Sequence, residues 1–166
     1  MVRVSKAVKQ RQAIIGRVEP ITLVDFNTRP IPAKVDTGAD LSSIWASKIR
    51  EHNDHLHFTL FDETSRYYTG ERIKIDRKAY RLTRVANSFG DRELRYVVKL
   101  RIKLDGRTIN ASFTLANRGL KTYPILLGRR LLKNKFLVDV SKGKPLYKQE
   151  TAKHEKLKAD LKHGKL

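Results

Sequence analysis

Alternating apolar and polar positions are the clearest pattern in the middle of the chain. Lysines and arginines alternate there with the apolar residues Val98, Leu100, Ile102 and Leu104. A second alternating stretch runs from Ile109 to Leu115, and a period of two predicts a strand with one buried face. Asp105-Gly106 separates the two stretches and is typical of a two-residue turn. The pattern therefore predicts a β-hairpin over residues 97–116.

Shorter strands are expected on both sides of this hairpin. Turn signals such as Arg29-Pro30 and Gly70 separate apolar stretches at residues 14–18, 20–26, 31–36, 56–61, 71–75, 80–86, 93–97 and 136–140. The segment "GRRLLKN", residues 128–134, is the best candidate for a core helix. Many short strands with one short helix predict an all-β fold, either a small barrel or a sandwich.

The ends of the chain differ from its middle in composition. Residues 1–12 are polar and basic without a clear period, which predicts a basic N-terminal arm. Residues 13–141 carry the strand pattern and are expected to form one domain. Residues 142–166 are rich in lysine and poor in apolar residues, so we expect a basic C-terminal tail that is partly helical or disordered.

Charge is the strongest global feature of the chain. It has 36 Lys and Arg residues against 17 Asp and Glu residues, a formal net charge of +19. Such a surface attracts polyanions, which makes weak association with RNA or ribosomes a candidate property, although a generally basic proteome gives the same composition. The chain has no cysteine, which excludes disulfides and thiolate metal sites. Without a signal peptide or a membrane-length apolar run, a cytoplasmic protein is expected.

Asp36 is the acidic residue with the most unusual sequence context. It lies in "AKVDTGADLSSIWA", residues 33–46, where most of its neighbours are apolar. An ionised carboxylate in such surroundings is costly unless hydrogen bonds or charges compensate it. Gly38 lets the backbone turn so that N–H groups can reach the carboxylate. The local pattern alone fits either a simple turn residue or a catalytic acid.

Two separate motifs resemble those of retropepsins, the single-domain aspartic proteases of retroviral type. "KVDTGAD" at residues 34–40 resembles their active-site loop, and "YPILLGRRLLKNKFLVDV" at residues 123–140 resembles their later Gly-Arg motif with its short helix and final strand. Over residues 14–143 the chain is similar to a bacterial and archaeal retropepsin-like family named ATP-dependent zinc proteases. The resemblance implies a small closed acid-protease β-barrel. It also implies a link with glutamate-ligase-like proteins of the ATP-grasp type.

The resemblance implies roles for particular residues of the two motifs. Asp36 corresponds to the catalytic carboxylate, Thr37 to a brace that reaches across to a partner chain, and Gly38 to a backbone contact with substrate. Ala39 belongs to the same supporting loop, and Asp40 and Arg129 match an acid and an arginine that pair beneath the substrate. Residues 125–128 are expected to form an apolar loop behind the catalytic turn.

The chain contains one Asp-Thr-Gly motif, whereas the chemistry of the family needs two carboxylates that share a proton. A C2 homodimer would supply Asp36 from a second copy. The hairpin over residues 84–96 would form the flap above the cleft, with Ser88, Phe89 and Gly90 near substrate. Its polar, charged tip differs from the glycine-rich apolar tips of viral retropepsins.

The zinc and ATP in the family name find no support in these residues. His52, His55 and His57 form the only local histidine cluster and are weak zinc candidates, because histidines in a polar loop are more often solvated. The chain has no Gly-x-x-x-x-Gly-Lys phosphate-binding loop. No cofactor is therefore expected.

The sequence favours one function over two alternatives. The favoured hypothesis is an aspartic peptidase that hydrolyses peptide or isopeptide-like amide bonds, with acidic, glutamate-containing substrates suited to the basic surface. The main alternative is a non-catalytic module of the same fold that binds nucleic acid or the ribosome through basic surfaces. A zinc hydrolase built on the histidine cluster ranks third.

Overall fold

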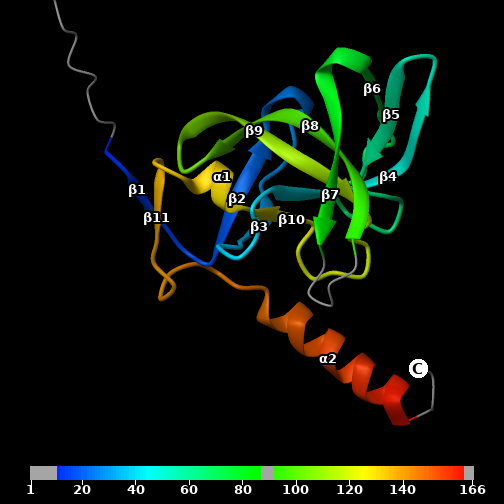
Figure 1. Cartoon of the computed structure of the whole chain (residues 1–166). Coiled ribbons are helices and arrows are strands. Elements are labelled where there is room, and N and C mark those ends of the chain that lie inside the picture. The colour runs from blue at the N-terminus through cyan, green and yellow to red at the C-terminus, as the bar shows by residue number, and fades with distance from the viewer. Residues whose placement is uncertain (1–10, 87–91, 163–166) are drawn as a thin grey trace, which may run out of the picture.

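The computed structural model describes residues 11–86 and 92–162 of the 166-residue chain (Figure 1). The strands are β1 (Ala13–Ile15), β2 (Val18–Leu23), β3 (Ile31–Val35), β4 (Ser42–His52), β5 (His55–Leu60), β6 (Arg72–Asp76), β7 (Tyr80–Ala86), β8 (Arg92–Leu104), β9 (Arg107–Ala116), β10 (Ile125–Leu127) and β11 (Phe136–Val138). The helices are α1 (Arg129–Leu132) and α2 (Tyr147–Lys162), and short 3₁₀ turns cover Val24–Phe26 and Arg77–Ala79.

Six strands of the described chain close into a barrel. They follow the order β10–β3–β2–β8–β9–β4, and β4 pairs in turn with β10. Two of these pairings, β10 with β3 and β4 with β9, are parallel, and the others are antiparallel. The expected all-β barrel of retropepsin-like type, with a short helix in its wall, is confirmed.

The predicted hairpin is confirmed together with its turn. β8 and β9 pair antiparallel up to Leu104 and Arg107. Asp105 and Gly106 between them have φ values of 48° and 72°, and left-handed backbone at both positions is what a two-residue turn of this kind requires. β8 is longer than expected, because the two stretches at 93–97 and 97–104 form one strand from Arg92.

Two barrel strands differ from the expectations. β4 was not expected at all, because its first five residues are all buried and show no alternation. Residues 125–127 were expected in a loop but form β10, which pairs with Ala33–Val35 of β3 on one side and with β4 on the other. Strands with both faces buried read as continuous apolar runs, and three residues are too few to show a period.

The core lies inside the barrel and continues beneath α1. Side chains from five of the barrel strands are almost completely inaccessible to solvent, namely Ile21, Ile31, Ile44, Ile102 and Ile125. Leu131 and Leu132 of α1 are also buried, which fixes the helix against the end of the barrel. The predicted helix in "GRRLLKN" is thus present as one short turn.

Two elements lie outside the barrel. β1 and β11 pair in parallel as a separate two-stranded sheet, with Ile14 opposite Leu137. α2 extends away from the barrel after residues 139–146 (Figure 1). Its start is attached by two hydrogen bonds: Leu146 N donates to the Tyr123 hydroxyl at 2.9 Å, and Arg17 donates to the Tyr147 hydroxyl at 3.0 Å.

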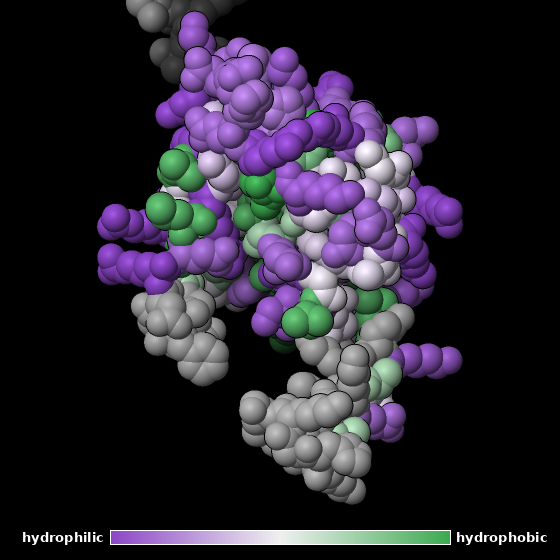
Figure 2. All heavy atoms as spheres, turned by 90° about the vertical axis from the view of Figure 1, so that its right-hand side faces the viewer, coloured by the Kyte–Doolittle hydropathy of each residue, from purple (hydrophilic) through white to green (hydrophobic). Residues whose placement is uncertain are grey.

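The surface is mostly hydrophilic on the face that carries β4, β5 and β6, where green apolar patches are small and scattered (Figure 2). None of the helices in the described part of the chain combines the length and apolar character needed to cross a bilayer.

Candidate active site

Asp36 lies directly after β3, at the point where β3 and β10 run side by side. Val35 pairs with Leu127, and the Asp36 N–H donates to the Leu127 carbonyl at 3.0 Å. This bond continues the parallel ladder by one residue. The strand pairing therefore fixes the backbone of the carboxylate residue before the chain turns.

The turn after Asp36 holds its carboxylate with backbone N–H groups. Asp36 Oδ1 accepts hydrogen bonds from the N–H of Gly38 at 3.0 Å and of Ala39 at 3.2 Å. The side chain is half-buried, whereas Thr37 is exposed. Both bonds go to one oxygen, and the described residues give no hydrogen bond to Oδ2. One carboxylate oxygen is thus fixed by the backbone of its own turn.

The Gly-Arg motif fixes this loop through hydrogen bonds from its backbone. Gly128 N donates to the Ser42 hydroxyl at 3.0 Å in a buried contact, and Arg129 N donates to the Ala39 carbonyl at 2.9 Å. A Cβ at Gly128 would lie 2.5 Å from the backbone carbonyl atoms of Leu41, so only glycine fits. The two motifs that the sequence analysis singled out therefore meet in space, about ninety residues apart in the chain.

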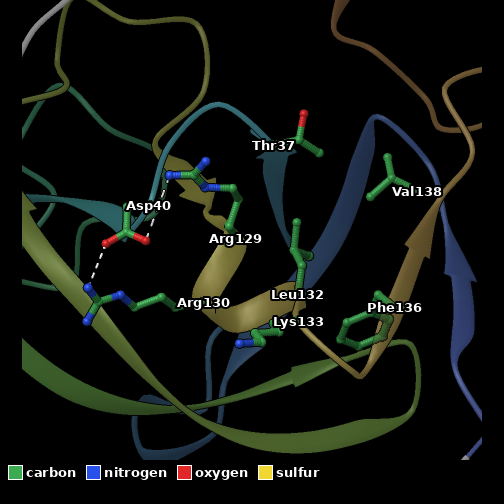
Figure 3. Close-up of a pocket in the computed structure, with 8 residues that line it drawn as sticks. All are labelled: Thr37, Asp40, Arg129, Arg130, Leu132, Lys133, Phe136 and Val138. Carbon is green, nitrogen blue, oxygen red and sulfur yellow. Dashed lines mark ion pairs between the residues drawn. The ribbon is translucent and has the colours of Figure 1, made fainter.

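Asp40 forms its closer ion pair with an arginine that the sequence analysis did not select. The Arg130 guanidinium is 2.8 Å from Asp40 Oδ2, and Arg129 is 3.9 Å from Asp40 Oδ1. Figure 3 shows the Asp40 carboxylate between the two arginines. All three side chains are largely exposed, so each ion pair adds at most about 1 kcal/mol to stability. Because Arg129 and Arg130 are adjacent in the sequence, the sequence does not indicate which of them lies nearer to Asp40.

A cavity of about 570 Å³ lies beside the loop that follows Asp36. Its lining residues are Thr37, Asp40, Arg129, Arg130, Leu132, Lys133, Phe136 and Val138 (Figure 3). Phe136 and Val138 come from β11, so the cavity connects the catalytic loop with the outer β1–β11 sheet. Asp36 itself is not in the lining, and the cavity adjoins the carboxylate rather than containing it.

Arg118 is a further cation near Asp36, and the sequence analysis missed it. It lies between β9 and β10, is half-buried, and its Nε donates to the Tyr123 carbonyl at 3.0 Å. Burial lowers the pKa of Arg118, Arg95 lowers it further, and the Asp36 carboxylate acts in the opposite direction. Arg118 is therefore within electrostatic range of both residues. One arginine in a loop of such a basic chain has no local pattern that distinguishes it.

The two strands of the hairpin expected over residues 84–96 are present as β7 and β8. The two strands pair from Tyr80–Val98 out to Ala86–Arg92. Ser88, Phe89 and Gly90, the expected substrate contacts at its tip, lie outside the described residues.

The three histidines considered as zinc candidates, His52, His55 and His57, lie in the β4–β5 hairpin. His52 is opposite His55 in the strand pairing, and the rings of His55 and His57 are 6.3 Å apart. Across the described residues, no group of three or more histidines, cysteines or acidic residues is arranged to hold a metal ion. The pKa of His57 is lowered mainly by burial. Arg50, Lys74, His55 and His52 lower it further.

Comparisons with known proteins give a family model and curated relatives that carry different names. The family model described as "RimB-like: Retropepsin-like aspartic endopeptidase RimB" matches residues 14–148. A probable alpha-L-glutamate ligase of Shewanella pealeana (strain ATCC 700345 / ANG-SQ1) is 33% identical over 164 residues, which cover 89% of this chain and 35% of that protein. The protein of the same name from Shewanella halifaxensis (strain HAW-EB4) is 34% identical over 87% of this chain and 32% of its own length. The chain thus spans about a third of these curated relatives.

A solved structure also matches. The protein Lpg0085 of unknown function from Legionella pneumophila subsp. pneumophila str. Philadelphia 1 has a TM-score of 0.61 and 31% sequence identity, with 80% of this chain and 96% of that chain covered. Almost the whole of that chain therefore corresponds to four fifths of this one.

Proposed function

Because the chain belongs to the RimB-like family of retropepsin-like aspartic endopeptidases, we propose that it is an aspartic peptidase that hydrolyses peptide or isopeptide-like amide bonds with Asp36. One observation carries this proposal. The Asp36 carboxylate is held through a single oxygen by two backbone N–H groups, in a loop that the Gly-Arg motif fixes from behind. A simple turn residue would not need the second motif.

The proposed chemistry uses two copies of Asp36, since the chain has one Asp-Thr-Gly. When two carboxylates share one proton, like-charge repulsion keeps one protonated while the other is ionised. The ionised carboxylate takes a proton from water as the water oxygen attacks the amide carbon, and the protonated one donates to the amide oxygen. The tetrahedral intermediate then collapses: its C–N bond breaks, the amine leaves with a proton from the dyad, and one hydroxyl of the intermediate returns a proton to the dyad as the carboxylic acid forms. We assign to Thr37, which is exposed, the role of a brace toward the partner's loop.

The β1–β11 sheet is the proposed dimer face. Ile14 and Leu137 pair across it and are 56% and 53% exposed, and Val140, two residues after the end of β11, is 72% exposed. Large apolar side chains grouped on one surface are typical of an interface. Phe136 and Val138 lie on the opposite face of the same sheet, because side chains alternate along a strand, and they line the cavity that reaches Thr37.

The proposed substrate is acidic and contains glutamate. The net charge of +19 favours association with acidic chains. The curated relatives carry the name of a glutamate ligase, but they are about three times as long as the matched region. We therefore assign to this chain a hydrolytic action on a glutamate-containing peptide, and not the ligase reaction.

The test compares cleavage of a diverse peptide library, rich in glutamate, by the wild-type protein and by Asp36→Asn. The variant keeps the shape of the side chain and removes its acid–base chemistry, so we expect cleavage to fall by at least about a hundredfold, the order of a single acid–base contribution. Asp105→Asn is the matched control, because Asn tolerates the left-handed backbone of that turn. Equal cleavage by wild type and Asp36→Asn, or a strictly monomeric wild type in sedimentation, would refute the dyad.

A second candidate function is binding of a polyanion without catalysis. The lysine-rich segment that forms α2 extends away from the barrel and offers a basic arm for nucleic acid or ribosomes (Figure 1). Purely electrostatic binding of this kind weakens steeply as salt rises. RNA binding that persists at high salt, together with no cleavage by the wild type, would favour this function over the peptidase.

A further inference from the structure

The cavity beside the loop that follows Asp36 has a charged side and an apolar side. Figure 3 shows Asp40 and the two arginines on one side, and Phe136 and Val138 on the other, with Leu132 between them. These three apolar residues, here called the apolar wall, pack against the core, so the wall is fixed. The volume of about 570 Å³ lies within the range of roughly 300–1,000 Å³ that is typical of ligand sites. The cavity therefore suits a side chain with an apolar stem and a charged end.

Positive charge exceeds negative charge in the lining of this cavity. Arg129, Arg130 and Lys133 are its cations, and Asp40 is the only acid among the described residues that line it. The three cations come from one short element, because Lys133 N donates to the Arg129 carbonyl at 2.8 Å and so closes a single helical turn. A concave surface with an excess of one sign of charge favours a ligand of the opposite sign. The lining thus indicates an anion as the ligand.

The two arginines differ in how closely Asp40 pairs with them. Arg130 is 2.8 Å from Asp40 Oδ2, whereas Arg129 is 3.9 Å from Asp40 Oδ1, which is close to the limit for an ion pair. Among the described side chains, no other carboxylate lies within ion-pair distance of Arg129, and none lies within that distance of Lys133. Arg130 therefore neutralises Asp40, while Arg129 and Lys133 keep their donors for a ligand.

We propose that Arg129 and Lys133 bind a carboxylate side chain of the substrate in this cavity. The methylene stem of that side chain packs against the apolar wall. The inference rests on the proposed peptidase function and names the residues that give it a preference for glutamate. A planar guanidinium binds a carboxylate through two parallel N–H donors, and the lysine adds a point charge. Asp40, at 3.9 Å from Arg129, is an internal carboxylate that competes with the ligand.

The position of the cavity assigns this side chain to a residue beside the cleaved bond. Thr37, which follows Asp36 directly, lines the cavity, whereas Asp36 does not. The bound carboxylate therefore lies next to the proposed catalytic acid and takes no part in the chemistry. This role of Arg129 differs from the one that the family resemblance implies, which is to pair with Asp40 beneath the substrate.

The experiment measures peptide binding and does not depend on cleavage. Fluorescence anisotropy with the full chain in the Asp36→Asn background compares three labelled peptides that differ only in carrying three glutamates, three glutamines or three aspartates. The ionic strength is about 0.15 M, at which distant charges are largely screened. Arg129→Gln and Lys133→Gln remove the two donors, and Asp40→Asn removes the internal competitor.

Two control variants make the same changes in net charge elsewhere. Lys74→Gln removes an exposed cation on β6, and Asp54→Asn removes an exposed acid in the β4–β5 turn, where Asn tolerates the left-handed backbone. Neither residue lines the cavity, and the β4–β5–β6 region lies away from α1 (Figure 1). Thermal melting checks folding, and Lys133→Gln carries the test if Arg129→Gln lowers the Tm.

We expect Arg129→Gln to weaken binding of the glutamate peptide by about tenfold, as for the loss of a charge-assisted hydrogen bond, and Lys133→Gln by about threefold, as for one exposed charge. Both variants should leave the glutamine peptide unchanged. Asp40→Asn should tighten the glutamate peptide more than Asp54→Asn does. The aspartate peptide should bind about fourfold more weakly than the glutamate peptide, because each side chain has one methylene group fewer to pack against the apolar wall.

Several results would overturn the inference. They are an absence of preference for the glutamate peptide over the glutamine peptide, a loss with Lys74→Gln as large as with Arg129→Gln, or an effect of Asp40→Asn no larger than that of Asp54→Asn. Equal binding of the glutamate and aspartate peptides would overturn the role of the apolar wall. Selective binding without any cleavage by the wild type would count against the peptidase alone. Cleavage by the wild type that is equal for the glutamate and glutamine peptides would count against the carboxylate site alone.

Discussion

Replacement of Gly128 by alanine tests whether the two motifs are held together by close backbone packing. The added Cβ would lie 2.5 Å from both the carbonyl carbon and the oxygen of Leu41, and 2.9 Å from Ser42 N. Non-bonded carbon atoms prefer about 3.5–4.0 Å, so the backbones must separate by about 1 Å. These neighbours are backbone atoms of the catalytic loop and β4, which cannot rotate away as a side chain could.

The expected cost has two parts. Overpacking a close contact costs about 1–3 kcal/mol, and the separation also breaks the buried bond from Gly128 N to the Ser42 hydroxyl. A buried donor left without a partner costs about 1–3 kcal/mol. The sum is about 4 kcal/mol, which corresponds to a decrease in Tm of about 10–15 °C for a domain of this size.

The assay is thermal unfolding followed by circular dichroism, with Gly106→Ala as the matched control. Gly106 has a φ of 72° and nothing within 4 Å of the added Cβ, so its substitution carries a conformational cost of about 1 kcal/mol and no steric one. Gly128 has a φ of −86°, so its cost is steric alone. A Gly128→Ala protein as stable as the wild type, or one that loses no more Tm than Gly106→Ala, would refute the packing argument.

Two further predictions concern buried polar groups. Ser42→Ala removes the hydroxyl that accepts the hydrogen bond from Gly128 N. In urea unfolding we expect it to lower the free energy of unfolding by about 1–3 kcal/mol with an unchanged m-value. A loss below about 0.5 kcal/mol would contradict this prediction. The pKa of His57 is lowered by burial and by Arg50, Lys74, His55 and His52, so the folded state prefers neutral His57. Stability from this group is therefore complete above the unfolded-state pKa of about 6.5 and decreases as pH falls below it. Tm should drop between pH 7.5 and pH 5 by less in His57→Gln than in the wild type, and an identical drop would exclude this role.

Sequence patterns predicted the parts of the fold whose burial changes along the chain in a simple way. The β8–β9 hairpin has one buried face and a turn whose two residues tolerate left-handed backbone, so both features were readable. The short helix α1 follows a glycine and buries two adjacent leucines, which matched the family motif. The position of Asp36 at the end of β3 was likewise expected from the apolar run before it.

The parts that were missed depend on partners far away in the sequence. The first five residues of β4 are all buried, and both edges of the strand are paired, with β9 on one side and with β10 and then β5 on the other. Nothing in "SSIWA" reveals those neighbours, and serine is a poor strand signal. Arg118 and Arg130 gain their significance from the carboxylates that the fold places near them. Local composition carries no information about such distances.

The geometry of the catalytic loop rests on these same missed elements. Asp36 N bonds to β10, Gly128 N bonds to the first residue of β4, and Ala39 accepts from the first residue of α1. Two segments that are about ninety residues apart in the sequence, 36–42 and 127–129, must therefore assemble around the carboxylate that Gly38 and Ala39 hold. An isolated Asp-Thr-Gly segment has none of these contacts, which is why the tripeptide alone predicts little about catalysis. The Gly-Arg motif is informative because its contacts fix the turn and, with it, the Asp36 carboxylate.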